Sequence, residues 1–282
     1  NDPDLVAHAS ASGARAVAGA GGLVAEGFPN ATWREEWVAS ALALIRSRGQ
    51  RGINFDFEGP LAAGSPEAEG YASLVEEAAK AFKAADPGMQ VSVDVAWSPD
   101  GIDGREYPAA RLGAAADLLF VMAYDTQSQV VQSRCVASAN SPHDAARRGL
   151  ERWLSAGVPA SKLVLGLPWY GYLYACQPPA GDEGEAAPEP VPTAVDLCRV
   201  RLEPFRGVAC SDAAGEQYSY ALVRGLLDGG NATTPRRWDA SQRSPYFNFV
   251  DRREGKGNAV TQAWYDDPES IAGKARMAGE MG

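Results

Sequence analysis

The sequence predicts an α/β fold, with a parallel β-sheet assembled from successive strand–helix units over residues 1–168. Three observations favour this fold: short apolar runs, Ala-rich helical stretches between them, and a spacing between the runs that accommodates a crossover helix. Parallel neighbours require such crossovers, whereas antiparallel strands can be joined by short turns. The expected strands are Ala14–Ala18, Ile53–Glu58, Val91–Ala96, Leu118–Ala123 and Leu163–Leu167.

Helix start signals support the connections between these strands. A helix over Trp33–Arg48 follows Thr32 and Glu35, which have the spacing of a capping box. The next helix opens at Ser65, which is followed by a proline at the first helical position. A further helix, over Pro142–Ala156, has the same Ser-Pro start. Strand and helix therefore alternate through this part of the chain.

The pattern changes after residue 168. Residues 169–265 are rich in aromatic residues, glycine and proline, and a helical pattern is evident there only over Tyr220–Leu227, so we expect a mixed α+β insertion. Within it, Gln177–Pro192 holds five prolines and four acidic residues, which predicts a surface loop. A final helix is expected from Pro268 to Met281.

The charge balance excludes two classes of partner. The chain carries 26 Lys and Arg against 36 Asp and Glu, a net charge of −10, whereas nucleic acid and anionic membranes both attract basic surfaces. No apolar run approaches the roughly 18 residues of a membrane-spanning helix. Hydrophobic residues make up 45% of the chain, as in folded globular proteins. Because the chain begins at Asn1 without a methionine, we expect a trimmed or partial polypeptide.

The cysteines favour disulfides over a metal site. No two of the four have the spacing of a zinc-binding pair, and the chain has only two histidines. Four cysteines allow three disulfide pairings, among which the sequence does not choose. Two Asn-x-Thr sequons, at Asn30 and Asn231, match the N-glycosylation pattern. Together these features favour a secretory or lysosomal compartment. The cysteines are Cys135, Cys176, Cys198 and Cys210.

The segment Gly52–Glu58 carries the strongest sign of function. Apolar and polar side chains alternate strictly along it, so Asn54, Asp56 and Glu58 share one face of the expected strand. A solvated face is the ordinary explanation of such a pattern. In a parallel sheet, however, both faces are covered, so carboxylates on a strand lie where burial is costly. Barrel enzymes keep catalytic groups at the carboxyl ends of strands, which favours a catalytic interpretation.

The spacing of the two carboxyls predicts different roles for them. Residues two apart on a strand lie ~6.6 Å apart along its axis and on the same face. Two partly desolvated carboxyls at this separation cannot both ionise freely, so one retains its proton to higher pH, as a general acid requires. Glu58, at the end of the expected strand, is the better-placed proton donor. Asp56 would orient and stabilise a cationic group.

These residues resemble the D-x-x-D-x-D-x-E signature of glycoside hydrolase family 18. Arg51 and Asn54 replace its first two acidic residues, whereas the last two are retained. Three further segments resemble family motifs and follow in the expected order. They are Phe120–Asp125, similar to the M-x-Y-D strand, Gly166–Gly171, similar to the G-x-P-x-Y-G strand, and Trp264–Pro268, similar to the return from the insertion into a helix.

The resemblance implies a (β/α)8 TIM barrel that is incomplete, with about five of the eight strands, the third to the seventh. Residues 1–168 and 266–282 would form the partial catalytic barrel, and 169–265 the α+β insertion after the seventh family strand. Two strands would precede Asn1 and one would follow Gly282. An open five-stranded sheet exposes two edges, so we expect the isolated chain to fold poorly.

The resemblance also implies a reaction. The family cleaves β-1,4-linked N-acetylglucosamine with retention, and the substrate's own acetamido oxygen is the nucleophile. Glu58 would protonate the glycosidic oxygen and then activate water, Asp56 would hydrogen-bond the acetamido N–H, and Tyr124 would position the acetamido carbonyl. No metal or other cofactor is implied.

A further set of residues is expected to bind the sugar. Asp125 and Tyr170 follow from the family motifs, and Asp94 shares the inward face and could support Asp56. Trp97, at a strand end, is equally consistent with sugar stacking and with core packing. The full substrate-binding set is Asn54, Asp94, Trp97, Met122, Asp125 and Tyr170, although Met122 also suits packing inside the barrel.

Longer runs are similar to exo-acting lysosomal members of the family that cleave the chitobiose core of N-glycans. They include Asp94–Pro99, Tyr124–Gln129, Pro204–Gly207 and Cys210–Gly215. The expected protein is therefore a monomeric glycosidase acting on chitobiose or chitooligosaccharides in the lysosome or after secretion. Two alternatives stay open: a non-catalytic lectin on the same scaffold, and an inactive fragment. Lectin-like members typically lose the acid, which this chain retains as Glu58.

Overall fold

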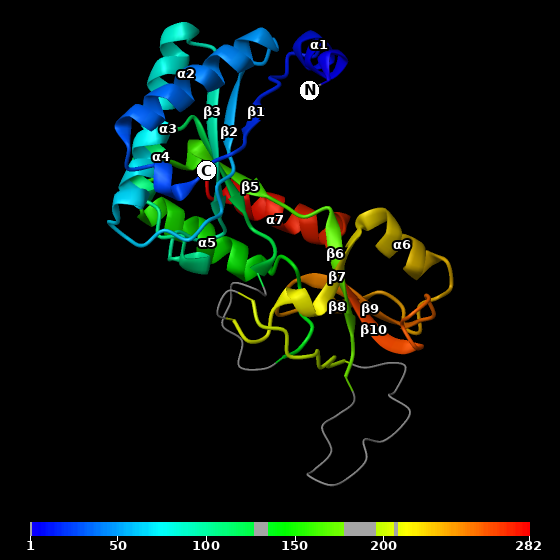
Figure 1. The fold of residues 1–282 in the computed structure, drawn as a ribbon. Helices are drawn as coiled ribbons and strands as arrows, with labels where there is room; N and C mark the ends of the chain where they lie inside the picture. Colours follow the sequence, from blue (N-terminus) through cyan, green and yellow to red (C-terminus); the bar gives the residue numbers. More distant parts are fainter. Residues whose placement is uncertain (1, 127–134, 178–195, 206–207) are drawn as a thin grey trace. The chain divides into compact units, whose positions relative to one another are not determined.

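The structure is a computed structural model, which describes residues 2–126, 135–177, 196–205 and 208–282 (Figure 1). The chain divides into two compact units. Unit 1 consists of Asn1–Met122, Arg148–Gly166 and Gly282, and unit 2 of Ala123–Arg147 and Leu167–Met281.

Unit 1 contains a parallel sheet of five strands, and each strand pairs with its neighbours in chain order. This order is the one expected of successive strand–helix units, so the predicted α/β fold is confirmed. The strands are β1 (Ala18–Ala20), β2 (Gly52–Phe55), β3 (Gln90–Ala96), β4 (Leu118–Met122) and β5 (Leu163–Gly166).

The two faces of this sheet differ in polarity. Val91, Val93 and Val95 alternate along β3 and are fully buried, and β3 contacts α3 (Pro66–Ala85). The intervening residues Ser92 and Asp94 lie on the opposite face. The sheet therefore has an apolar face and a more polar face, and the polar face carries Asn54 and Asp94 of the predicted site.

The helices of unit 1 follow the predicted connections between strands. The helix that opens at Ser65 is confirmed, because the Ser65 side chain accepts a hydrogen bond from the Ala68 N–H and Pro66 is the first helical residue. The helices are α1 (Pro3–Ala11), α2 (Ala31–Ser47), α3 and α4 (Ala109–Ala115), with 3-10 turns η1 (Ala25–Gly27), η2 (Ile102–Gly104) and η4 (Ala160–Lys162). The helix α5 (His143–Ser155) begins in unit 2 and ends in unit 1.

Two local predictions are wrong. The capping box of Thr32 and Glu35 does not form, because Asn30 caps α2 by accepting from the Trp33 N–H at 3.2 Å. Thr32 is therefore inside the helix. The first strand is Ala18–Ala20 instead of Ala14–Ala18, because these three residues pair in register with β2.

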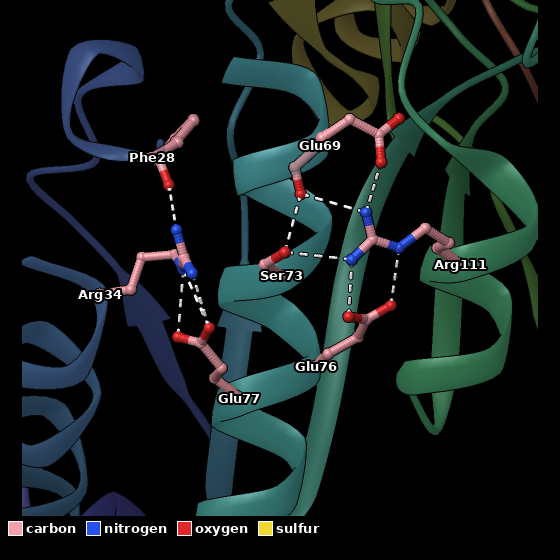
Figure 2. Close-up of polar contacts among 7 residues, drawn as sticks. All are labelled: Phe28, Arg34, Glu69, Ser73, Glu76, Glu77 and Arg111. Carbon is pink, nitrogen blue, oxygen red and sulfur yellow. Dashed lines mark hydrogen bonds and ion pairs between the residues drawn. The ribbon is translucent and has the colours of Figure 1, made fainter. Parts of the chain in front are cut away.

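Two arginines hold α3 to its neighbouring helices (Figure 2). Arg34 of α2 donates to the Glu77 carboxylate from Nε at 3.0 Å and to the Phe28 carbonyl from Nη1 at 2.7 Å. Arg111 of α4 makes a bidentate pair with Glu76, with distances of 2.8 and 2.7 Å, and also contacts Glu69 and Ser73. The hydrogen bonds that Arg111 donates to the Glu76 carboxylate raise the pKa of Arg111. These networks join α2 and α4 to α3.

Unit 2 is built around an antiparallel sheet in the order β7-β6-β10-β9-β8. Its strands are β6 (Tyr170–Ala175), β7 (Gly215–Ser219), β8 (Arg237–Asp239), β9 (Ser244–Asp251) and β10 (Ala259–Trp264). Its helices include α6 (Tyr220–Asp228) and α7 (Pro268–Glu280), with the 3-10 turn η5 (Asp212–Ala214). The two helices expected over Tyr220–Leu227 and from Pro268 to Met281 are therefore confirmed, whereas the division into a partial barrel (1–168 and 266–282) and an insertion (169–265) stays a prediction.

Two disulfides lie in unit 2 and select one of the three possible pairings. Cys135 bonds Cys210, and Cys176 bonds Cys198. The second lies in a buried cluster with Tyr172, Tyr174 and Trp264 on one face of the sheet. Most of the predicted Pro-rich loop, residues 178–192, is outside the described residues. In the described ranges, no helix is long and apolar enough to cross a bilayer.

Candidate active site

Asn54 connects β2 to β3 on the polar face of unit 1. Its Oδ1 accepts from the Ser92 hydroxyl at 2.7 Å, and its Nδ2 donates to Oδ2 of Asp94 at 2.8 Å. The three side chains meet because Asn54 and Ser92 are register partners in the parallel ladder, and Asp94 lies two residues further on the same face. The polar face predicted from the alternation in Gly52–Glu58 is thus continued on the next strand.

Asp94 has the perturbed carboxyl of this group. Burial raises its pKa to about 6, the hydrogen bond from Asn54 opposes this rise, and the negative charges of Asp56 and Glu58 add to it. The influence of these two carboxylates places all three acidic groups in one electrostatic cluster. Asp94 therefore retains a proton in mildly acidic solution.

Asp56 and Glu58 follow the end of β2 and are exposed, with 47% of the Glu58 side chain accessible. The expectation that both carboxyls are partly desolvated is therefore wrong. The physical reason is that β2 ends at Phe55, so both residues lie beyond the hydrogen-bonded ladder. The apolar alternation persists, because Ile53 and Phe55 are buried.

A buried arginine contacts Glu58. Arg105 Nη1 lies 3.1 Å from Glu58 Oε2, and its Nη2 lies 3.2 Å from Asp103 Oδ2. The Tyr107 hydroxyl lies 2.9 Å from the carbonyl oxygen of Phe57 and 2.7 Å from that of Gly59. Sequence reasoning missed these residues, because nothing in a charged turn-like segment indicates contact with a strand almost 50 residues earlier.

Trp97 and Met122 lie at the carboxyl ends of β3 and β4 in unit 1, and both are half-buried. The Trp97 backbone closely approaches Gly149 of α5, where a side chain would collide with the Trp97 carbonyl oxygen. The Trp97 indole nitrogen is buried without a hydrogen-bond partner in the described structure. Met122 pairs in register with Ala96 and Gly166. Sugar contact by either residue stays a prediction.

Asp125 is the centre of a second polar group, in unit 2. Its Oδ1 accepts from the Tyr170 hydroxyl at 2.5 Å and from the Tyr172 hydroxyl at 2.9 Å. Its backbone N–H donates to Asn140 Oδ1 at 2.7 Å. Asp125 has a φ of 53°, in the left-handed region, which is unfavourable for most residues and is maintained by these contacts.

The tyrosines around Asp125 are held as proton donors. Burial raises the pKa of Tyr170, with a further contribution from the charge of Asp125. Burial also raises the pKa of Tyr172, with contributions from Asp212 and Asp125. The Tyr124 ring meets the Tyr170 ring edge to face at 6.1 Å. Tyr124, Asp125 and Tyr170 thus lie together, and Tyr172 and Asn140 are the members that sequence reasoning did not assign.

Each of the two groups has its own chemistry. In unit 1, exposed carboxylates lie beyond the end of a parallel strand, where a proton donor and an orienting anion act in barrel enzymes. In unit 2, a carboxylate with one oxygen already bonded can accept sugar hydroxyls with the other. Among the residues that the structure describes, no cluster of three His, Cys, Asp or Glu side chains could hold a metal ion.

A parallel α/β sheet with paired acidic residues at a strand end defines the class as a glycosidase of barrel architecture. The chain belongs to the glycosyl hydrolases family 18, whose model matches residues 17–282. The family resemblance drawn from the motifs is therefore confirmed.

The relatives within the family include several di-N-acetylchitobiases. That of Rattus norvegicus is 37% identical over 281 residues, which cover 100% of this chain and 71% of the relative. The "Probable di-N-acetylchitobiase 2" of Dictyostelium discoideum is 40% identical over 260 residues, covering 91% of this chain and 64% of the relative. These likenesses confirm the branch of the family that the longer sequence runs predict.

Solved structures confirm the fold class. The chitinase of Cycas revoluta in complex with (GlcNAc)3 superposes with a TM-score of 0.73 at 23% identity, covering 99% of this chain and 77% of that chain. At this level of identity the likeness shows the fold, and the five-stranded parallel sheet of unit 1 is consistent with part of such a barrel.

Proposed function

We propose that this glycosidase hydrolyses the β-1,4 bond between N-acetylglucosamine residues, in chitobiose units and chitooligosaccharides, with retention of configuration. The observation that carries the proposal is the position of Asp56 and Glu58, exposed and two residues apart immediately after β2. The relatives support the substrate class, since those of Rattus norvegicus and Dictyostelium discoideum are named as di-N-acetylchitobiases.

Glu58 acts first as the general acid. The acetamido oxygen of the substrate attacks C1, the bond from C1 to the glycosidic oxygen breaks, and that oxygen takes the proton of Glu58. An oxazolinium ion forms and the leaving sugar departs. The Glu58 carboxylate then takes a proton from water, whose oxygen attacks C1 and reopens the oxazoline ring. This sequence suits the site because the nucleophile belongs to the substrate and is already held in place.

Asp56 orients the acetamido group and stabilises the positive charge of the intermediate. A carboxylate close to the developing charge stabilises it electrostatically. Asp94, connected through Asn54, adds a carboxyl with a pKa of about 6 to the same cluster. We assign Asn54 and Asp94 to setting the charge around Asp56.

We assign substrate binding to further residues. Tyr124 positions the acetamido carbonyl, while Asp125 and Tyr170 bind sugar hydroxyls at the cleavage subsite. Asp125 suits this role because its Oδ1 accepts two tyrosine hydroxyls, and its Oδ2 is a second carboxylate oxygen that can accept from a sugar. Trp97 stacks on a sugar ring and Met122 contributes apolar contact. The disulfides fit an oxidising compartment, so we place the enzyme in the lysosome or outside the cell.

The deciding experiment compares the wild-type protein with Glu58→Gln, using di-N-acetylchitobiose and tri-N-acetylchitotriose as substrates. Loss of the general acid should lower kcat by about 10²- to 10⁴-fold, while affinity for the oligosaccharide survives. Glu36→Gln, an exposed change on α2, serves as the matched control and should retain full turnover.

Two outcomes would contradict the proposal. Equal turnover by wild type and Glu58→Gln would remove Glu58 from the mechanism. Binding of the oligosaccharides without turnover by the wild type would instead identify the chain as a lectin on this scaffold.

A further inference from the structure

The Arg105 side chain is almost fully buried, although the Glu58 carboxylate that it contacts is exposed. Only 2% of its side chain is accessible, against 47% for Glu58. The second partner, Asp103, is 3% accessible and lies 3.2 Å from Nη2. Arginine is seldom fully buried without a paired charge, and the buried Asp103 carboxylate is enough to provide one.

The segment that carries Arg105 is fixed against the segment that carries Glu58. The Leu61 N–H donates to the Gly104 carbonyl at 2.9 Å, and the Glu106 N–H donates to the Leu61 carbonyl at 3.0 Å. The Glu106 carboxylate accepts from the Ala63 N–H at 2.9 Å. Together with the Tyr107 contacts to the backbone at residues 57 and 59, these bonds form a short interlocked pair of loops.

Backbone strain accompanies this arrangement. Asp103 has a φ of 55°, in the left-handed region, which is uncommon for residues other than glycine although aspartate tolerates it better than most. Its side chain nevertheless points to the guanidinium of Arg105. Non-glycine residues in such conformations are concentrated at functional sites, where surrounding contacts hold them.

Stability does not explain the contact with Glu58. A salt bridge to a half-exposed carboxylate contributes little, since solvent screens it and the long side chains lose freedom. Asp103 already balances the buried charge. The contact does have a geometric effect, because it occupies Oε2 of Glu58 from a rigid base and leaves Oε1 for a substrate.

We propose that Arg105 is a positioning residue for Glu58, which holds the carboxyl so that its second oxygen faces the glycosidic bond. This inference rests on the proposed function, because it assumes that Glu58 is the proton donor. Arg105 acts through Glu58 and does not touch the substrate. A fixed acid matters because a small misplacement of a reacting group slows the chemical step strongly.

The test measures kcat and KM of Arg105→Met and Arg105→Lys on di-N-acetylchitobiose. Arg105→Met should lower kcat by about 10- to 100-fold while KM stays within about threefold. Arg105→Lys, which retains the charge without the planar fork, should recover part of kcat. Arg111→Met removes another paired arginine of the same unit and should leave kcat unchanged.

A double-mutant cycle separates positioning from a general structural role. In the Glu58→Gln background, Arg105→Met should cause no further loss of kcat, because the group that it positions is gone. Fully additive losses would overturn the inference, as would wild-type kcat in both Arg105 variants. If Arg105→Met does not fold, the test uses Arg105→Lys and the double-mutant cycle of Arg105→Lys with Glu58→Gln. An active Glu58→Gln enzyme would refute the proposed function itself, whereas an inactive one beside fully active Arg105 variants would refute only this inference.

Discussion

The Tyr172 hydroxyl donates a 2.9 Å hydrogen bond to Oδ1 of Asp125, the same oxygen that accepts from Tyr170. Gln217 completes this chain by donating from Nε2 to the Tyr172 oxygen at 2.8 Å. A carboxylate with one oxygen bonded twice has little rotational freedom. Tyr172 therefore orients Asp125 for its proposed contact with the sugar.

Replacing Tyr172 with phenylalanine should raise KM for tri-N-acetylchitotriose several-fold, with a smaller change in kcat, because Asp125 loses one of its two orienting donors. Unfolding in urea should show a loss of about 1–2 kcal/mol, since Gln217 loses its acceptor. Tyr174→Phe is the matched control on the same strand: its hydroxyl is buried without a partner in the described residues. It should retain KM and stability. Similar KM values in the two variants would show that Tyr172 does not position Asp125.

Asp94 should make the stability of the fold depend on pH. Burial raises the pKa of Asp94 from 3.8 to about 6. The hydrogen bond from Asn54 opposes this rise, and the negative charges of Asp56 and Glu58 add to it. Between pH ~4 and ~6 the folded protein retains a proton that the unfolded chain has released, so this group's contribution to stability falls as pH rises. Asp94→Asn removes the titrating group, and with it this loss of stability as pH rises.

Urea unfolding of wild type and Asp94→Asn across pH 4–8 measures this effect. The variant should gain stability relative to wild type as pH rises through the window and then reach a constant difference above pH ~6. The asparagine oxygen can still accept from Asn54, so the contact itself survives. A difference independent of pH would show that Asp94 titrates alike in the folded and unfolded states.

The sequence predicts the parts of the fold that local pattern controls. Ser65 and the following proline mark the start of α3, and the alternation in Gly52–Glu58 predicts the faces of β2. The capping box was predicted wrongly for a local reason. Asn30 and Thr32 are both good N-cap residues, and only the residue at which α2 begins determines which of them is the cap.

Side-chain exposure and contacts that depend on distant segments could not be predicted from local sequence patterns. The exposure of Asp56 follows from the point where the ladder with β3 ends. The contact of Arg105 with Glu58 follows from pairing between two loops more than 40 residues apart. Neither feature leaves a periodic signal in the sequence, whereas the proposed catalytic pair, Asp56 and Glu58, does.

The network around Arg111 should contribute to stability without affecting catalysis. Its bidentate pair with Glu76 is reinforced by Glu69 and Ser73, and several joined charges contribute more than an isolated surface pair. Arg111→Met should lower the free energy of unfolding in urea by about 1 kcal/mol. Arg152→Met, which removes an exposed bidentate pair with Asp100, should cause no measurable change. Equal losses in both variants would show that the additional partners of Arg111 contribute nothing.

Asp56 should control the affinity for an inhibitor that resembles the oxazolinium intermediate. A thiazoline analogue of N-acetylglucosamine carries the fused ring, and its protonated form presents a positive charge to the carboxylate. Asp56→Ala should weaken its binding by about 10²-fold, because transition-state-like ligands gain most from groups that act on the developing charge. Binding of tri-N-acetylchitotriose, which lacks that charge, should weaken much less. Titration calorimetry with both ligands separates the two effects, and equal affinity of wild type and Asp56→Ala for the thiazoline would exclude assistance by the acetamido group as the role of Asp56.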